Sequence, residues 1–166
     1  MMRDIILIAH NLRSCHNVGS LLRTAEGLGV QKVILSGYTP HPGFAGDRRL
    51  PHEVAKLTKQ IHKTALGAEE LVVWEYHADI LPVISHLKKA DYTVAAVEQT
   101  ADSIALPKYH PPERVALLVG REVEGVELEV LTACDRVLEI PMFGNKESFN
   151  VVQAAAMALF YCRFTV

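Results

Sequence analysis

Residues 137–161 read VLEIPMFGNKESFNVVQAAAMALFY, and this stretch decides how the rest of the chain is interpreted. Its apolar run Val137–Ile140 is stopped by Pro141, which predicts the end of a strand. A polar loop over residues 143–147 follows, and Ser148 stands where the N-cap of an alanine-rich helix is expected. A loop between a strand and a helix start presents unpaired N–H and C=O groups that can bind the polar edge of a planar ligand such as adenine. A simple capped core helix explains this stretch alone equally well.

The size and composition indicate one globular domain over residues 1–166. The 166 residues are 49% hydrophobic and 22% charged, and no apolar run approaches the roughly 18 residues of a membrane span. The N-terminus lacks a signal-peptide pattern, so we expect a cytoplasmic protein without membrane contact. The three cysteines, Cys15, Cys134 and Cys162, form no CxxC pair, and His52-Glu53 lacks the second histidine of a zinc helix, so no metal site is expected.

The net charge of −2 hides an asymmetry along the chain. Residues 1–66 hold nine Lys and Arg against four acidic residues, a net charge of +5, so the remainder carries −7. A basic half is compatible with a polyanion bound on one face, although solvated surface charge explains the pattern equally simply.

Strand and helix patterns alternate along the chain. Apolar runs predict strands over residues 4–9, 32–36, 71–76, 92–97, 115–119 and 137–140. Helical spacing predicts helices between them, over residues 18–28, up to about 65, over 80–89 and over 126–132. This alternation is typical of an α/β fold with a mainly parallel sheet flanked by helices. Ligands of such sheets bind beyond the carboxyl ends of the strands, where Glu98 and residues 120–124 and 142–148 are expected to gather.

The first half carries a predicted helix and a long loop. Asn17 is a plausible N-cap for the first helix and Gly29 a plausible stop. Residues 37–51 hold three prolines and three glycines, which indicates an extended, functional loop or lid. The Gly27-Leu-Gly29 pair ends a helix and lacks a third glycine, so it is not a dinucleotide-binding motif.

Three polar segments remain: residues 17–25 (NVGSLLRTA), 118–126 (LVGREVEGV) and 140–151 (IPMFGNKESFNV). In this order and spacing they resemble the three motifs of the SpoU/TrmH family, the branch of the SPOUT superfamily that methylates ribose 2′-hydroxyls of RNA. The resemblance runs from about residue 11 to the C-terminus, and residues 63–69 (KTALGAE) also resemble the family.

The resemblance implies a C-terminal trefoil knot, a homodimer, and S-adenosylmethionine bound in the knot by backbone groups. Carried over by position, the cofactor contacts are Val97, Glu98, Gly120, Ile140, Met142, Ser148 and Phe149. Arg23 falls on the family's catalytic arginine, with Asn17, Glu122, Ser148 and Asn150 around the reacting groups. Two roles for Arg23 stay open, because a guanidinium normally remains protonated: it takes the hydroxyl proton, or it orients the substrate phosphate.

The resemblance also implies which substrate is bound and how the protein holds it. The chain corresponds to a catalytic domain without a separate RNA-binding domain, so we expect the dimer itself to hold the RNA, with transfer RNA favoured over ribosomal RNA. The expected phosphate contacts are Arg13, Arg23, Arg48, Arg49, Lys56, Lys59 and Lys63.

The chain departs from the family pattern at three positions. Val123 stands where the second motif usually has glycine, Val152 replaces a frequent serine, and Phe149 replaces a common leucine. Val123 and the acidic total prompt one alternative, a catalytically silent RNA-binding paralogue, against which the presence of Arg23, Ser148 and Asn150 argues. A small-molecule methyltransferase or nucleotide-binding enzyme on the same scaffold is another, which the basic half disfavours.

Overall fold

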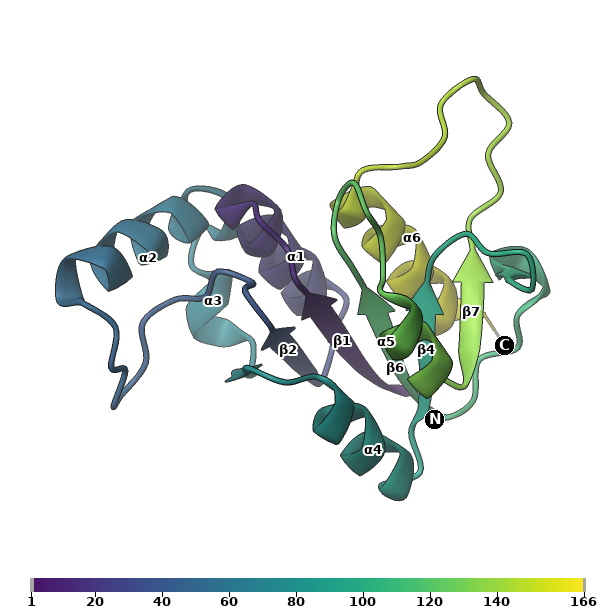
Figure 1. Cartoon of the computed structure of the whole chain (residues 1–166), viewed down its shortest axis with the longest axis horizontal. Helices are drawn as coiled ribbons and strands as arrows, with labels where there is room; N and C mark the ends of the chain where they lie inside the picture. The colour runs from purple at the N-terminus through teal and green to yellow at the C-terminus, as the bar shows by residue number, and fades with distance from the viewer. Residues whose placement is uncertain (1, 166) are drawn as a thin grey trace.

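A seven-stranded sheet forms the centre of the computed structural model, which describes residues 2–165 (Figure 1). Its spatial order is β3-β2-β1-β6-β4-β7-β5, and every pair of neighbours runs parallel. The strands are β1 (Asp4–His10), β2 (Lys32–Ser36), β3 (Trp74–His77), β4 (Thr93–Val97), β5 (Ile104–Ala105), β6 (Arg114–Val119) and β7 (Arg136–Glu139). Parallel pairing brings the carboxyl ends of all these strands to one edge of the sheet.

Helices cover both faces of the sheet. They are α1 (Cys15–Gly27), α2 (Pro51–Ala65), α3 (Ala68–Leu71), α4 (Leu81–Lys89), α5 (Leu128–Ala133) and α6 (Val151–Phe164), with a 3₁₀ turn η1 (Leu106–Lys108). One core cluster joins α1, α2 and α6 to the sheet, and a second joins α4 and α5 to the opposite face. No helix among residues 2–165 is long and apolar enough to cross a bilayer.

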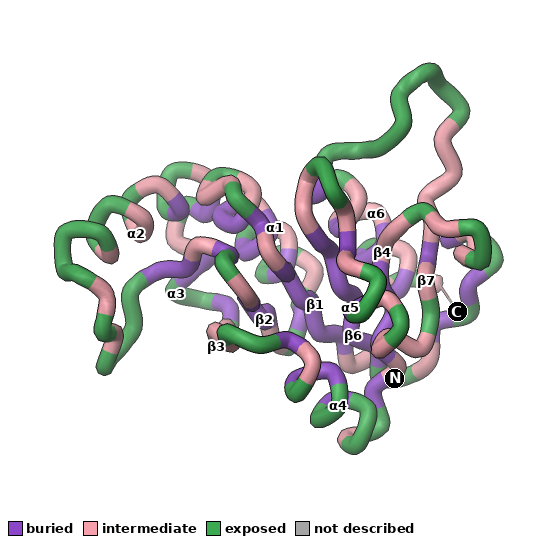
Figure 2. Tube along the Cα trace, in the orientation of Figure 1, coloured by how far each residue is buried: buried purple, intermediate pink, exposed green. Residues whose placement is uncertain are grey.

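The continuous apolar run in β1 is explained by burial on both sides. Ile5, Leu7 and Ala9 belong to the first cluster, while Ile6 and Ile8 belong to the second. Successive side chains of a strand point to opposite faces, so a central strand between two helical layers has no solvent-facing side. Figure 2 shows this buried centre, with exposed loops at its rim.

The predicted α/β architecture is confirmed, and most strands lie within a residue or two of their predicted bounds. The predicted strand over 71–76 is wrong at its start, because Leu71 ends the short helix α3 and the strand begins only at Trp74. The two-residue strand β5 was not predicted, since so short an edge strand has no periodicity to detect.

Both predicted N-caps are wrong by two or three residues. Ser14 caps α1 by accepting a hydrogen bond from the Asn17 N–H at 3.2 Å, which leaves Asn17 inside the first turn. Asn150 caps α6 by accepting from the Val152 N–H at 2.9 Å, so Ser148 lies in the preceding loop. Gly29 does follow the end of α1, with the left-handed φ of 62° that favours glycine after a helix.

Gly19 allows the close packing of α1 against α2. A Cβ at this position would lie 2.2 Å from the Ile61 carbonyl oxygen and 2.9 Å from the Ala65 backbone nitrogen. Both atoms belong to the backbone of α2, so the helix as a whole would have to move. The glycine in the first motif is therefore explained by helix packing.

We predict that Gly19→Ala lowers the free energy of unfolding by about 1–3 kcal/mol, because overpacking forces the two helix backbones apart. Urea unfolding followed by circular dichroism measures the change. Gly27→Ala on the same helix is the control: no atom lies within 4 Å of its Cβ position, so stability should hold or rise by up to about 1 kcal/mol. Equal losses in both variants would contradict the packing argument.

Candidate active site

A cleft opens at the carboxyl ends of β4, β6 and β7. Its wall comes from four segments: residues 97–99 at the end of β4, residues 119–125 at the end of β6, Ile140 after β7, and Ser148, Phe149, Val151 and Ala154 around the start of α6. Of the residues expected to hold a cofactor, the wall includes Val97, Glu98, Gly120, Ile140, Ser148 and Phe149. Met142 lies outside this lining, in the loop that joins β7 to α6.

Glu98 fastens the end of β4 to the loop over residues 120–126. One carboxylate oxygen accepts from its neighbour, the Gln99 N–H, at 2.8 Å, and the other accepts from the Val126 N–H at 3.0 Å. Gly125 has a φ of 70°, and a Cβ there would lie 2.3 Å from the Glu98 Oε2 atom. Glycine is therefore favoured at this position by its backbone conformation, and a methyl group there would also displace the Glu98 carboxylate.

The same loop closes in a tight turn. The Gly125 N–H donates to the Arg121 carbonyl at 3.2 Å, and the Arg121 side chain donates to the Gly125 carbonyl at 3.1 Å. Val123 lies at the tip of the turn, 86% exposed and outside the left-handed region. The turn thus accommodates valine at position 123 without backbone strain. Replacing glycine by valine there gives no steric reason to expect an altered loop shape.

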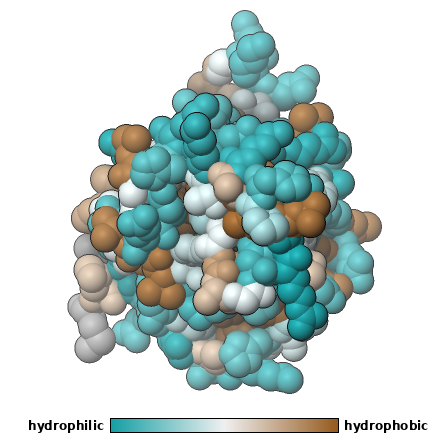
Figure 3. All heavy atoms as spheres, turned by 90° about the vertical axis from the view of Figure 1, so that its left-hand side faces the viewer, coloured by the Kyte–Doolittle hydropathy of each residue, from teal (hydrophilic) through white to brown (hydrophobic). Residues whose placement is uncertain are grey.

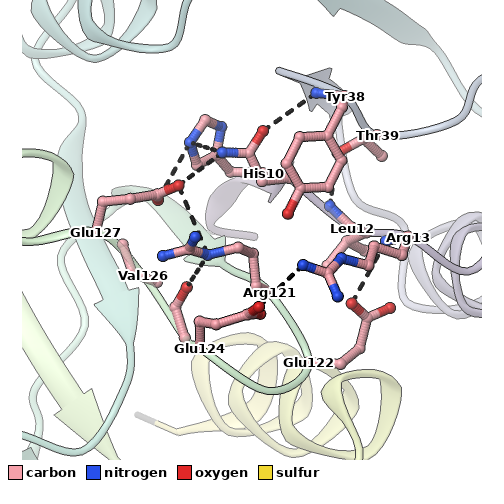
Figure 4. Close-up of polar contacts among 12 residues, drawn as sticks. His10, Leu12, Arg13, Tyr38, Thr39, Arg121, Glu122, Glu124, Val126 and Glu127 are labelled. Carbon is pink, nitrogen blue, oxygen red and sulfur yellow. Dashed lines mark hydrogen bonds and ion pairs between the residues drawn. The ribbon is translucent and has the colours of Figure 1, made fainter.

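Asn17 and Glu122, predicted to lie among the reacting groups, are in direct contact. The Asn17 side-chain amide donates to Glu122 Oε1 at 3.0 Å. Arg13 adds two links to the same loop, since its backbone N–H donates to Glu122 at 3.4 Å and its guanidinium pairs with Glu124 at 2.9 Å (Figure 4). The β1–α1 loop and the cleft wall are therefore joined by polar contacts.

Arg23 lies exposed on α1, outside the residues that line the cleft. Pairing with Glu26 or Glu122, the simple surface role for this arginine, is absent from the ion pairs within residues 2–165. Asn150 uses its side chain to cap α6, while Ser148 is exposed at the cleft wall. The structure thus places Glu122 and Ser148 in the cleft wall, with Asn17 bonded to Glu122, and leaves Arg23 and Asn150 outside the lining.

The basic residues over 48–63, all expected to contact phosphate, divide into two groups. Arg48, Lys56, Lys59 and Lys63 are exposed, and the face that carries α2 is largely hydrophilic (Figure 3). Arg49 instead donates to Asp47 and to the carbonyls of His41 and Pro42, at 3.2 and 3.1 Å. Its hydrogen bonds lower the pKa of Asp47 to about 2. Arg49 therefore organises the loop over residues 37–50.

A partly buried polar network around His10 was not predicted. His10 Nδ1 lies 2.8 Å from the Ser36 hydroxyl, and its Nε2 lies 3.0 Å from the Asn11 amide nitrogen. Asn11 also donates to Glu127 at 2.7 Å. Burial lowers the pKa of His10, which favours the neutral imidazole. The neutral ring accepts a hydrogen bond from the Asn11 amide. The polar run over residues 10–17 was the only signal for this network in the sequence.

Comparison with known proteins agrees with this architecture. The model of the SpoU rRNA Methylase family matches residues 4–160. The chain is 32% identical over 158 residues to the 23S rRNA (guanosine-2′-O-)-methyltransferase RlmB of Acinetobacter baylyi, covering 94% of this chain and 58% of that protein. It is 27% identical to a tRNA (guanosine(18)-2′-O)-methyltransferase of Thermus thermophilus, covering 95% and 73%.

The fold is also found in solved structures. An AdoMet-bound rRNA methyltransferase from Sinorhizobium meliloti superposes with a TM-score of 0.81 at 21% identity, covering 98% of this chain and 57% of that one. The chain thus spans somewhat more than half the length of the RlmB relative and of this structure. Because the family model extends over nearly all of its residues, the chain belongs to the SpoU rRNA Methylase family.

Proposed function

We propose that this protein transfers a methyl group from S-adenosylmethionine to a ribose 2′-hydroxyl of RNA. The observation that carries the proposal is the cleft itself, in which the second and third motifs meet at the carboxyl ends of β4, β6 and β7. Family membership supports the reaction type, and the named relatives act on transfer and ribosomal RNA. A transfer RNA is the favoured substrate and a cytoplasmic location is part of the proposal.

The residues of the cleft fit S-adenosylmethionine. Apolar side chains of Val97, Val119, Ile140 and Phe149 offer faces for an adenine ring, and backbone groups of the 120–125 loop offer polar partners for its edge. Glu98 and Glu122 line the same cleft, where carboxylates favour a positively charged sulfonium. When bound, the cofactor supplies an activated methyl group, so the site requires no metal for the transfer.

The protein's own task is to position the hydroxyl and ease the loss of its proton. We assign Asn17, Glu122, Ser148 and Asn150 to the surroundings of the reacting groups, with Asn150 also capping α6. Arg23 orients the substrate phosphate, because a guanidinium stays protonated and binds phosphate in a bidentate manner. Its exposed place on α1 leaves it free to meet RNA that approaches the cleft.

We assign the RNA contacts to exposed cations in the first half of the chain. Arg13, Arg48, Lys56, Lys59 and Lys63 are exposed and suited to phosphate binding, whereas Arg49 contributes by holding its loop. Val123 fits the turn without strain, so it gives no support to the alternative of a catalytically silent paralogue.

A homodimer and the C-terminal knot complete the proposal. The α6 helix presents Phe160 and Phe164, 58% and 61% exposed, with ring centroids 4.7 Å apart. With the fully exposed Phe143 and with Met157 they form one apolar groove, of the kind that a second copy of the chain covers. Residues 141–150 loop outward from β7 before α6 returns to pack on β1, β4 and β6, which is the segment expected to be threaded (Figure 1).

Arg23→Ala should lower methyl transfer at least about a hundredfold while leaving S-adenosylmethionine binding unchanged, because the lost group holds substrate and not cofactor. Transfer of labelled methyl to total RNA and calorimetric cofactor titration measure the two effects. Arg23→Lys, which keeps the charge and loses the bidentate geometry, should retain part of the activity. Loss of cofactor binding in Arg23→Ala would contradict this role.

Gly125→Ala should weaken S-adenosylmethionine binding about tenfold or more, because the added methyl group strains the backbone and displaces Glu98. Isothermal titration with the cofactor and with its demethylated product measures the change. Gly144→Ala is the matched control in the neighbouring loop, since its Cβ position is open and its φ is ordinary. A wild-type protein that binds neither compound would refute the proposed function.

Analytical ultracentrifugation should give a dimer of the 18.4 kDa chain, and Phe160→Glu should give monomers because a charge in the apolar contact is not solvated. Leu71→Glu, at an exposed apolar residue on α3, should leave the dimer intact. A monomeric wild type would show that the α6 groove is not a contact between copies.

A further inference from the structure

Tyr38 is an exposed aromatic residue beside the candidate reacting groups. Its side chain is 52% exposed in the turn that follows β2. The phenol lies next to the Arg13 guanidinium, and Figure 4 shows both at the same edge as Glu122 and Glu124. Arg13, which lies beside the aromatic ring, in turn contacts Glu122 and Glu124 in the loop that lines the cleft.

The backbone of this turn is fixed from several sides. Asn11 adopts a left-handed φ of 56° and accepts the Tyr38 N–H at 3.1 Å. Gly37 also has a positive φ, of 66°, and a Cβ there would lie 1.9 Å from the Asn11 side-chain oxygen. The Tyr76 hydroxyl donates to the Gly37 carbonyl at 2.8 Å. Asparagine and glycine adopt this left-handed conformation readily, so these contacts hold the turn in one shape without backbone strain.

Thr39, the residue after Tyr38, is also held by several hydrogen bonds. Thr39 is 2% exposed, and its hydroxyl lies 2.7 Å from the Ser36 carbonyl and 3.1 Å from the Ala9 carbonyl. The same hydroxyl accepts the Leu12 N–H at 3.0 Å. Tyr38 is therefore an exposed residue whose two chain neighbours, Gly37 and Thr39, are both held in place. Little ordering of the backbone is needed when a ligand contacts its ring.

We propose that Tyr38 is a stacking platform for an unpaired base of the RNA substrate, with Arg13 on the phosphate beside it. This inference rests on the proposed function and adds the class of RNA that the site accepts. A base inside a duplex has both faces covered by its neighbours, whereas a base in a loop offers a face to an aromatic ring. Stacking on one aromatic residue strengthens binding about five- to 150-fold per base.

Hexaadenylate RNA and an abasic hexamer with the same ribose phosphates are the probes, each labelled with fluorescein and titrated by anisotropy. Their charges are equal, so a difference in affinity reports the bases. Wild type should bind hexaadenylate about tenfold or more tightly than the abasic hexamer. Tyr38→Ala should bind both alike, at the affinity of wild type for the abasic hexamer, and Tyr38→Phe should keep the preference.

Phe44→Ala is the matched control. Phe44 is 49% exposed in the same long loop, but its ring lies against His41 and Trp74, with centroids 5.7 and 6.5 Å away. It should keep the wild-type preference for hexaadenylate. If Tyr38→Ala fails to fold, Tyr38→Leu carries the test, because it retains an apolar side chain and lacks the aromatic face.

The inference is overturned if wild type binds the two hexamers equally, if the folded Tyr38 variants without a ring keep the preference, or if Phe44→Ala loses it as well. Cofactor titration on the same variants separates this from the proposed function. Normal S-adenosylmethionine binding with no role for Tyr38 refutes only the platform. A preference that depends on Tyr38 without any cofactor binding refutes only the methyl transfer.

Discussion

Parallel pairing of β4 with β6 and β7 is the constraint on which the site depends. Segments far apart in sequence end at one edge of the sheet only because these strands run in the same direction. The remaining closure is local: the Glu98 carboxylate accepts the Val126 N–H, and glycine at position 125 permits the approach. A buried sheet thus fixes where the loops begin, and a few polar contacts fix their shape.

The charge asymmetry of the chain has a structural meaning. The acidic second half supplies Glu98, Glu122 and Glu124 to the cleft wall, while the first half supplies exposed cations along α2. Arg13 joins the two regions through its pair with Glu124, in which both side chains are substantially exposed. Such a pair adds little stability, so its value lies in orienting the β1–α1 loop.

Features set by apolar periodicity could be predicted from the sequence, whereas features set by individual hydrogen bonds could not. β2 was predicted with its observed bounds because both of its faces are buried. The caps were misplaced because serine and asparagine occur close together at both helix starts, and only backbone geometry decides between them. Ser14 and Asn150 are the N-caps for that reason.

The candidate site was predicted in the same uneven way. Sequence patterns placed Glu98 and Gly120 at strand ends and Ser148 just before the last helix, and all three line the cleft. They gave no indication that Arg49 turns inward to the carbonyls of its own loop, because a basic residue in a polar segment reads the same in either role. The His10 network was also missed, since its contacts join residues far apart in the chain.

The position of α6 has a consequence for how the molecule is assembled during synthesis. This helix follows every strand in the chain, yet it covers one face of β1, the first strand. Until α6 leaves the ribosome, that side of the nascent sheet lacks part of its apolar cover, and neither Phe149 nor Ala154 is in place to complete the cleft. The cleft is therefore completed only when the last helix of the chain has been synthesised and packed.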